Sequence, residues 1–484
     1  MQRSPTESAF FDHDHPLNFR TKRGTINFNN KTGIPINPLK TKDIERETFL
    51  KQLYEELGLT PDELNLVKEV NFAVPKDPKE YVINPETGKI SAASIVQLFL
   101  VLTDPDTGLD FQRQFLQTFV CYMRPQLLLS MLITRYTVPL NVPDINITSA
   151  NSLNQIQIRI IRVLSSWLNM STLHFKDDNM VTGLLKFSAF IRDETLDEAH
   201  QSNQYKIVTS EINRFTGSGS KPVVTKREMP DPILPRIKED KWTSIQIFNP
   251  EEVSRQFTLL HSDLFRRIEP NELLEAIWFD NKQGTHKLNE LIRMFDIFSG
   301  YVSLTVLNGA NSRERAHVYK YWVDVATEFE KIHNYHGLFS VCCGLNHASV
   351  KRLYKTMKVI GKTKPQKKAL MDKLFQICDF SDDYGAYRAI IAKAVEPCVP
   401  FIGCFQKDLK YVQETYPNRI EGLINFKKCV ECYALLKTIQ RFQNIGYYYI
   451  PVPKLQKLIL DLQEPPSTTE LMKISLSKEK KKNG

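Results

Sequence analysis

The sequence lacks several features that would define a protein class at once. It has no uninterrupted apolar run of about 18 or more residues, so it predicts no membrane-spanning helix. Its first residues, Met-Gln-Arg-Ser-Pro, are not followed by the apolar segment of a secretory signal. A glycine at position 2 for myristoylation and a C-terminal prenylation box are also missing. We therefore expect a soluble, cytoplasmic protein, with recruitment to the inner membrane surface as an open alternative.

The motifs of conventional enzymes are missing as well. The chain has no GxxxxGK[ST] phosphate loop, nucleophile elbow, HExxH zinc motif, EF-hand loop or dinucleotide-binding fingerprint. Without such a constellation, the sequence assigns no residues to covalent catalysis. We expect no cofactor, no metal and no nucleic-acid partner.

Cysteine and histidine are the residues that could still suggest a metal site. The eight cysteines are dispersed among apolar neighbours, so we expect reduced and mostly buried thiols. Cys429-Val-Glu-Cys432 is a CxxC motif, but no second CxxC or HxxxH lies near it in sequence. Because a zinc ribbon needs that second pair, we interpret these two cysteines as core residues.

The stretch HNYHGLFSVCCGLNH is the densest group of possible ligands. On a helix, at roughly 100° per residue, His336, Cys343 and His347 would lie in one narrow sector, as zinc ligands must. However, Gly337 and Gly344 disfavour one uninterrupted helix. We expect the histidines to lie in loops or at helix ends with structural or interface roles, and a zinc site is the alternative.

At 484 residues, with 42% apolar and 25% charged residues, the chain has an ordinary globular composition and room for two or three domains. Its first forty residues predict poor order, and Ile44–Leu57 has a helical pattern closed by Gly58. Apolar residues then recur at helical spacing over residues 90–192, and again from 249 to about 462. The sequence therefore predicts two all-α units.

Two segments outside these units have a different composition. Between residues 193 and 248 apolar density falls, and glycine, serine and proline predict a linker. Part of the net charge of +9 lies in Lys478–Lys482, which reads Lys-Glu-Lys-Lys-Lys. We expect this tail to be solvated, and peripheral contact with an anionic membrane is the alternative.

Four ordered motifs in the second unit resemble those of the Ras guanine-nucleotide-exchange catalytic domain. The family pattern D-L-F followed by P-x-E-L is similar to HSDLFRRIEPNELL, which starts at His261. The family's N-x-N-G…V-x-R-L resembles the segment from Asn334 to Leu353. Its P-x-V-P-F/Y-x-G resembles PCVPFIG from Pro397, and its I-N-F-x-K resembles INFKK from Ile424. Four ordered matches are a specific signal.

The first unit resembles the Ras exchanger motif domain that usually precedes this catalytic domain. The matching segments are KISAASIVQL from Lys89, FLQTF from Phe115 and VLSSWL from Val163. The resemblance implies an all-α fold in which the small domain buttresses a helical hairpin that protrudes from the larger one. It divides the chain into an N-terminal region, partly disordered with a short helix (1–88), the exchanger motif domain (89–192), a linker (193–249), the catalytic domain (250–465) and a basic tail (466–484).

The resemblance also implies a function. Such a protein accelerates GDP release from a Ras-like small GTPase by inserting the hairpin, which opens the switch region and disrupts the Mg²⁺ and phosphate site. Because it makes and breaks no covalent bond, it is a regulatory factor, and it works by binding the nucleotide-free GTPase more tightly. A catalytically degenerate scaffold that binds small GTPases without exchange is the alternative.

Residues that match family positions can be assigned roles on this basis. On the hairpin, Glu414 matches the acid that engages the P-loop hydroxyl, and Lys410 stands where the family often has an apolar or small residue. Either Lys410 substitutes electrostatically for Mg²⁺, or Leu409 takes the blocking role. The residues expected to contact the GTPase are Leu291, Ile292, Arg293, Cys343, Asn346, Tyr384, Phe401 and Lys407.

Two further matches are expected to be structural. Arg315 and Arg352 correspond to family arginines, and we interpret both as buried, ion-paired supports of the fold.

Overall fold

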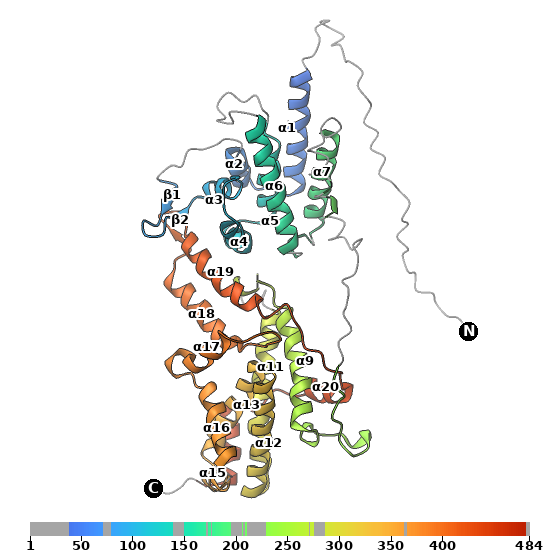
Figure 1. The fold of residues 1–484 in the computed structure, drawn as a ribbon, viewed down its shortest axis with the longest axis vertical. Helices are drawn as coiled ribbons and strands as arrows, with labels where there is room; N and C mark the ends of the chain where they lie inside the picture. The colour runs from blue at the N-terminus through green and yellow to red at the C-terminus, as the bar shows by residue number, and fades with distance from the viewer. Residues whose placement is uncertain are drawn as a thin grey trace, which may run out of the picture.

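The computed structural model describes residues 38–70, 79–138, 150–170, 173–175, 177–194, 206, 209–210, 229–270, 272–274, 286–362 and 365–480. In this part of the chain helices dominate, which confirms the all-α class, and a small four-stranded sheet is present. No described helix is both long and apolar enough to cross a bilayer. Figure 1 shows the helices of the first unit at one end of the molecule and those of the second at the other.

The first unit is a helical domain with one β-hairpin. Its elements are α1 (Pro38–Glu56), α2 (Pro61–Glu69), β1 (Tyr81–Ile83), β2 (Ile90–Ala93), α3 (Ile95–Leu102), α4 (Leu109–Thr118), α5 (Pro125–Tyr136), α6 (Ala150–Met170) and α7 (Asp178–Glu194). The expected helix over Ile44–Leu57 is confirmed as part of α1. The segment before Ser94 is a strand rather than helix, because Ser94 itself caps α3 by accepting a hydrogen bond from the Gln97 amide at 3.2 Å.

Residues before position 89 contribute to the core of this domain. Leu53 and Leu57 on α1 and Val67 on α2 are buried, and the ring of Phe49 stacks on Phe190 of α7 at 4.6 Å. Thr60 and Glu63 form a complete capping box at the start of α2. The first 88 residues were expected to hold one short helix, whereas the described part holds two that pack on α5 and α7.

The second unit is the larger helical domain. Its elements are α9 (Pro250–Arg266), α11 (His286–Asn308), α12 (Ser312–Lys331), α13 (Tyr335–Asn346), α14 (Ala348–Lys351), α15 (Tyr354–Gly361), α16 (Pro365–Ile377), α17 (Gly385–Ile391), α18 (Ile402–Thr415), β3 (Arg419–Ile420), β4 (Leu423–Ile424), α19 (Phe426–Gln440), α20 (Pro453–Leu460) and α21 (Thr468–Lys478). Helices α9, α11, α12 and α13 pack together at its centre. Trp322 and Phe257, both fully buried, lie against the ring of Phe298 there.

The described end of the predicted linker also belongs to this domain. Trp242, Ile245 and Phe248 are buried, and the Tyr321 hydroxyl donates hydrogen bonds to the carbonyls of Ile245 and Phe248. The expectation of a linker is therefore wrong for these residues, because they cover the apolar face of the helical core.

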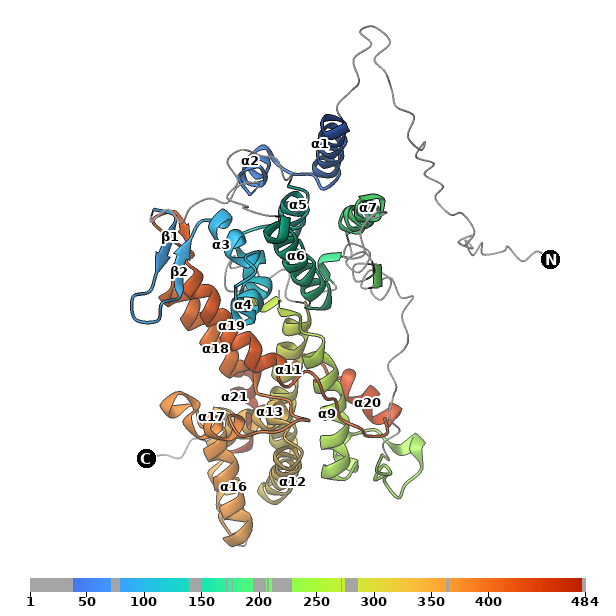
Figure 2. The same cartoon turned by 45° about the horizontal axis from the view of Figure 1, so that its top comes forward.

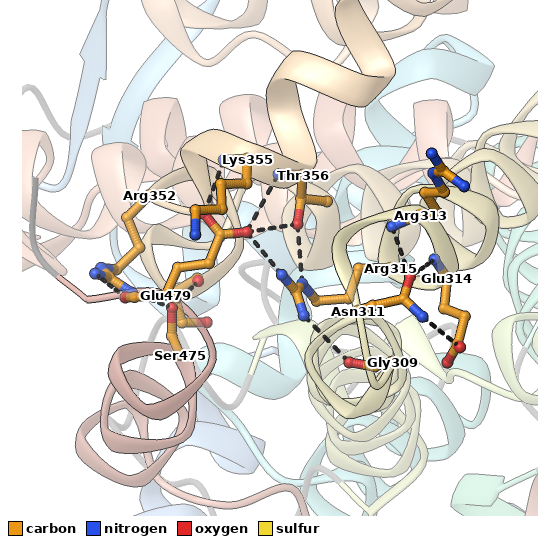
Figure 3. Close-up of polar contacts among 11 residues, drawn as sticks. Gly309, Asn311, Arg313, Glu314, Arg315, Arg352, Lys355, Thr356, Ser475 and Glu479 are labelled. Atoms are coloured by element: carbon orange, nitrogen blue, oxygen red, sulfur yellow. Dashed lines mark hydrogen bonds and ion pairs between the residues drawn. The ribbon is translucent and has the colours of Figure 1, made fainter.

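The prediction of a solvated tail at Lys478–Lys482 is wrong for Glu479 and right for the exposed Lys480, and Lys481 and Lys482 lie outside the described residues. Helix α21 packs on α11 and α14, and Glu479, just after its end, is buried and ion-paired with Arg315 at 2.7 Å (Figure 3). This confirms the buried, ion-paired role expected for Arg315. Arg352 is half-buried and donates to Ser475 Oγ at 2.8 Å and to the Glu479 carbonyl at 2.7 Å, so it supports the same corner through neutral acceptors.

Candidate functional site

Helices α18 and α19 form a hairpin that lies beside the small domain (Figure 2). Asn425 starts α19: its side-chain oxygen accepts from the Lys428 amide at 3.3 Å, and its side-chain nitrogen donates to the Pro417 carbonyl at 2.9 Å. The tight turn between β3 and β4 uses Glu421 and Gly422, with φ values of 50° and 84°. These contacts fix how the two helices are connected.

The small domain holds this hairpin by backbone and side-chain contacts. Strands β1 and β2 of the small domain and β3 and β4 of the hairpin form one sheet in the order β1-β2-β4-β3, with Ala93 opposite Ile424. The rings of Phe111 and Phe426 lie 5.0 Å apart, and Gln117 Nε2 donates to Gln440 Oε1 at 3.1 Å. The hairpin is therefore braced from α4 and β2, on the side away from the helical core of the larger domain.

One face of α18 remains exposed. The side chains of Lys410 and Glu414 are 72% and 66% exposed, with Lys410 Nζ 3.6 Å from Glu414 Oε1. Tyr411 between them is also exposed, although the sequence did not single it out. Leu409 is only 4% exposed and lies on the opposite, packed face. Of the two candidates for the blocking role, Lys410 is the one that stands on the accessible face.

An aromatic cluster lies near the base of α18. The Phe401 ring stacks on Phe339 at 4.0 Å, with Phe295 at 5.6 Å and Tyr384 at 6.0 Å. The Phe401 amide donates to the Tyr387 hydroxyl at 2.8 Å, and burial raises the pKa of that phenol well above its usual range. Tyr384, Phe295 and Phe401 are half-buried, so the cluster forms a rigid and partly accessible apolar surface.

A network of charges ties the loop before α17 to α18. Arg388 pairs with Asp408 through both guanidinium nitrogens, at 2.6 and 3.0 Å, and with Asp383 at 3.0 Å. Lys407 pairs with Asp383 at 2.5 Å, and its ammonium lies 5.5 Å from the Tyr384 ring centroid. The hydrogen bond from Lys407 lowers the pKa of Asp383. Because Asp383 and Tyr384 have positive φ values of 50° and 61°, this network stabilises a loop conformation that is costly by itself.

The three residues of α11 that were predicted to contact the GTPase differ in their exposure. Leu291 is fully buried, Ile292 is half-buried, and Arg293 is exposed and paired with Glu464 at 2.6 Å. The Leu291 carbonyl faces His336 Nε2 at 3.3 Å. Leu291 therefore supports the surface from beneath, whereas Ile292 and Arg293 can touch a partner.

The histidine- and cysteine-rich stretch forms a single helix, α13, contrary to the expectation that its glycines would interrupt one. A Cβ on Gly337 would lie 2.7 Å from the Phe329 ring, and one on Gly344 would lie 2.5 Å from the Ser299 carbonyl. These glycines thus permit close packing of α13 on α12 and α11. The helix exposes Cys343 and leaves Asn346 half-buried, on the helix that also supplies Phe339 to the aromatic cluster.

The three histidines of this stretch have separate surroundings. His336 is the second residue of α13, which agrees with the expected position at a helix end, and burial lowers its pKa to about 4, so it is neutral. His347 caps α14 by accepting from the Ser349 amide at 3.3 Å, and His333 precedes α13 with a φ of 58°. Within the described ranges, no three histidine, cysteine or acidic side chains converge as metal ligands. Cys429 and Cys432 are buried, which confirms them as core residues.

The structure thus brings Tyr384, Phe401 and Lys407 into one cluster and places Lys410 and Glu414 farther along α18. Sequence reasoning missed Arg388 and Asp408, because residues twenty positions apart on different helices leave no periodic pattern. It also missed Phe339, which lies inside the apolar stretch of α13 and could have been found from its family-matched segment.

Comparisons with known proteins agree with this architecture. The model of the RasGEF N-terminal motif matches residues 89–190, and that of the RasGEF domain matches residues 252–430. Three Dictyostelium discoideum proteins are similar over most of this chain. Ras guanine nucleotide exchange factor V is 28% identical over 87% of this chain and 21% of its own length. Factor I is 28% identical over 77% of this chain and 44% of its own length. Factor A is 26% identical over 81% of this chain and 66% of its own length. The chain therefore spans about a fifth to two thirds of the length of these relatives. With an N-terminal exchanger motif followed by a RasGEF domain, it belongs to the Ras guanine-nucleotide exchange factor family.

Proposed function

We propose that this protein is a guanine-nucleotide exchange factor that accelerates GDP release from a Ras-like small GTPase. The observation that carries the proposal is the braced hairpin: α18 exposes Lys410 and Glu414, and Phe401 at its start belongs to the rigid aromatic cluster. An exchange factor needs both a stiff element that displaces one part of the GTPase and a surface that grips another. In this proposal the hairpin is the stiff element and the aromatic cluster is the gripping surface.

The proposed activity requires no covalent step. GTPases hold their nucleotide through Mg²⁺, the P-loop and the switch segments. A protein that binds the nucleotide-free form more tightly lowers nucleotide affinity by the same factor, because linkage is reciprocal. The residues that matter are therefore those that bind and position the GTPase in its nucleotide-free intermediate.

The charged face of α18 fits the role of the displacing element. The Glu414 carboxylate can accept a hydrogen bond from a hydroxyl or amide released from Mg²⁺ and phosphate. Lys410, one turn before it, can hold positive charge near the position that Mg²⁺ leaves. Their loose 3.6 Å contact is solvent-exposed, so separating them to meet a partner costs about 0.5 kcal/mol or less.

The aromatic cluster fits the role of the gripping surface. Phe401 and Tyr384 offer partly exposed rings whose positions are fixed by stacking and by the Arg388 network. Ile292 and Arg293 lie on α11, the helix that supplies Phe295 to the cluster, and Cys343 and Asn346 lie on α13, the helix that supplies Phe339. Aromatic and arginine side chains on a preorganised surface are the usual centres of binding energy.

The test is release of fluorescent GDP from a panel of Ras-, Rap- and Ral-type GTPases. Wild-type protein should accelerate release from at least one member, and Glu414→Ala should slow that release by about tenfold or more. Glu55→Ala, an exposed acid on α1 of the other domain, is the matched control and should leave the rate unchanged. Failure to accelerate release from any member would refute the exchange activity.

The alternative, a scaffold without exchange activity, gives a different pattern. A scaffold would bind a GTPase equally well with and without nucleotide, and Glu414→Ala would change nothing. An exchange factor should bind the nucleotide-free GTPase much more tightly than the GDP-bound form. Pull-downs in the presence of EDTA or of Mg²⁺ and GDP separate the two cases.

A further inference from the structure

One short segment has a net charge almost as large as that of the whole chain. Residues 348–371 contain seven lysines and Arg352 and no aspartate or glutamate. The whole chain has a net charge of +9, so this segment accounts for nearly all of it. Neither the hairpin nor the aromatic cluster uses any of these residues.

The fold gathers these lysines on one surface. Lys355, Lys358 and Lys362 have the spacing of neighbours on one side of a helix, at and just after α15, and all three are exposed. Thr356 and Ile360 on the other side of α15 are buried, where α15 packs on α12. Lys351 at the end of α14 and Lys368 in α16 are exposed as well. We call Lys351, Lys355, Lys358, Lys362 and Lys368 the lysine face.

The charges of the lysine face are not neutralised within the part of the chain that the structure describes. Its five ammonium groups form no ion pair with a described carboxylate, whereas the neighbouring Lys367 pairs with Asp324 at 2.8 Å. Beside them the Tyr354 ring is 41% exposed, with Lys355 Nζ 5.9 Å from its centroid. The face therefore combines unpaired ammonium groups with an accessible aromatic ring.

A buried ion pair fixes the orientation of this surface. Glu479 accepts hydrogen bonds from the amides of Lys355 and Thr356 at the start of α15, at 2.8 and 3.2 Å, and it pairs with Arg315 (Figure 3). This anchor holds the end of α21 beside α15, so the exposed Lys480 adds to the same region. The backbone that carries the lysine face is thus part of the rigid domain.

We propose that the lysine face binds the anionic surface of a membrane. Lysine is a compact, strongly hydrated point charge suited to diffuse attraction by lipid headgroups, whereas arginine dominates where bidentate recognition is needed. The face follows the outer side of a helix, so it presents a broad surface rather than a groove. An accessible tyrosine beside the lysines suits the headgroup region, where amphipathic rings accumulate. The position of α15 and α16 in Figure 1, at the end far from the small domain, leaves this surface free of the hairpin.

The test is sedimentation of the full chain with vesicles of phosphatidylcholine, with or without phosphatidylserine. The protein should sediment only with the phosphatidylserine vesicles, and added salt should release it because the interaction is electrostatic. The variant with Lys355→Gln, Lys358→Gln and Lys362→Gln should lose about a hundredfold in partitioning, since each lysine near an anionic surface contributes a factor of about five.

A matched control removes the same charge elsewhere. The variant with Lys51→Gln, Lys68→Gln and Lys89→Gln changes three exposed lysines of the small domain and should bind these vesicles as the wild type does. Equal losses in both variants would show that only net charge matters and would overturn the proposal. The proposal would also be overturned if the wild type did not bind phosphatidylserine vesicles but bound a DNA duplex through the same lysines. Because vesicle binding is measured without a GTPase, its failure is distinct from failure of the proposed exchange activity.

Discussion

Replacing Glu479 by methionine should destabilise the larger domain by about 3–5 kcal/mol. The change leaves the Arg315 guanidinium, which is only 3% exposed, without a counter-charge. It also removes the acceptor for Thr356, whose amide and hydroxyl donate to Glu479 Oε1 at 3.2 and 2.9 Å. An unpaired buried charge costs far more than the pair contributes, because the charge loses hydration without compensation.

A double-mutant cycle isolates this interaction. Arg315→Met alone should be similarly destabilising, because the buried Glu479 carboxylate then lacks its partner. The double variant should be more stable than either single one, since two apolar side chains can fill the space without a buried charge. Lys457→Met is the control: its pair with Asp461 at 2.8 Å is solvent-exposed, so the loss should be at most about 1 kcal/mol.

The assay is urea unfolding followed by circular dichroism, with hydrogen exchange of α21 as a local readout. The single variants should lower the urea midpoint and speed exchange throughout α21. Single losses below about 1 kcal/mol, or losses that simply add in the double variant, would refute the view that Glu479 is an essential buried partner of Arg315.

The same residue sets a pH dependence. Burial raises the pKa of the Glu479 carboxyl, but hydrogen bonds from Lys355, Arg315 and Thr356 together outweigh it, and the pKa lies below its ordinary value. An acid whose pKa is lowered by folding stabilises the native state above its unfolded pKa of about 4.3. That contribution is lost as pH falls through the folded pKa. The stability gap between wild type and Glu479→Met should therefore shrink below about pH 4 and stay constant between pH 6 and 8.

Three further predictions concern the packing around the site. Gly337→Ala should cost about 1–3 kcal/mol in urea unfolding because its Cβ would meet the Phe329 ring at 2.7 Å, whereas Gly361→Ala, with nothing within 4 Å, should be neutral or slightly stabilising. Phe111→Ala removes the ring that packs on Phe426 of the hairpin, so it should speed amide hydrogen exchange in α19 and slow nucleotide release from the GTPase. An unchanged rate of amide hydrogen exchange in α19 would contradict a bracing role for this ring. Cys343 is exposed on α13, but burial raises the pKa of its thiol to about 12, so a maleimide should label it slowly in the free protein and more slowly still when a nucleotide-free GTPase is bound; labelling that the GTPase does not slow would place α13 outside the interface.

Much of the helical architecture could be predicted because amphipathic periodicity is a local property. Ile44–Leu57 and the apolar stripe of α6 required only the spacing of their own residues. The strands β2 and β4 could not be predicted in this way. They are only four and two residues long, too short for a clear alternating pattern, and the pairing of Ala93 with Ile424 joins segments more than three hundred positions apart in sequence.

Predictions from glycine content and from charge failed at two places where the segment is buried in the folded protein. Gly337 and Gly344 normally weaken a helix, but here the close approach of Phe329 and Ser299 requires them. The lysine-rich composition near Glu479 suggests solvated chain, yet Arg315 and the start of α15 draw that carboxylate into the protein. Both predictions failed because the composition of a segment does not show which residues from distant parts of the chain pack against it in the folded protein.

The family motifs could be read from residues alone, since their order and spacing are properties of the chain. They identified the two domains and proposed Glu414, Lys410, Tyr384 and Phe401 as site residues. The tertiary structure decided which side chains are accessible: it buried Leu409 and Leu291, exposed Lys410, and joined Lys407 to Asp383. Accessibility and pairing depend on contacts between distant segments, and those contacts exist only once the helices have packed.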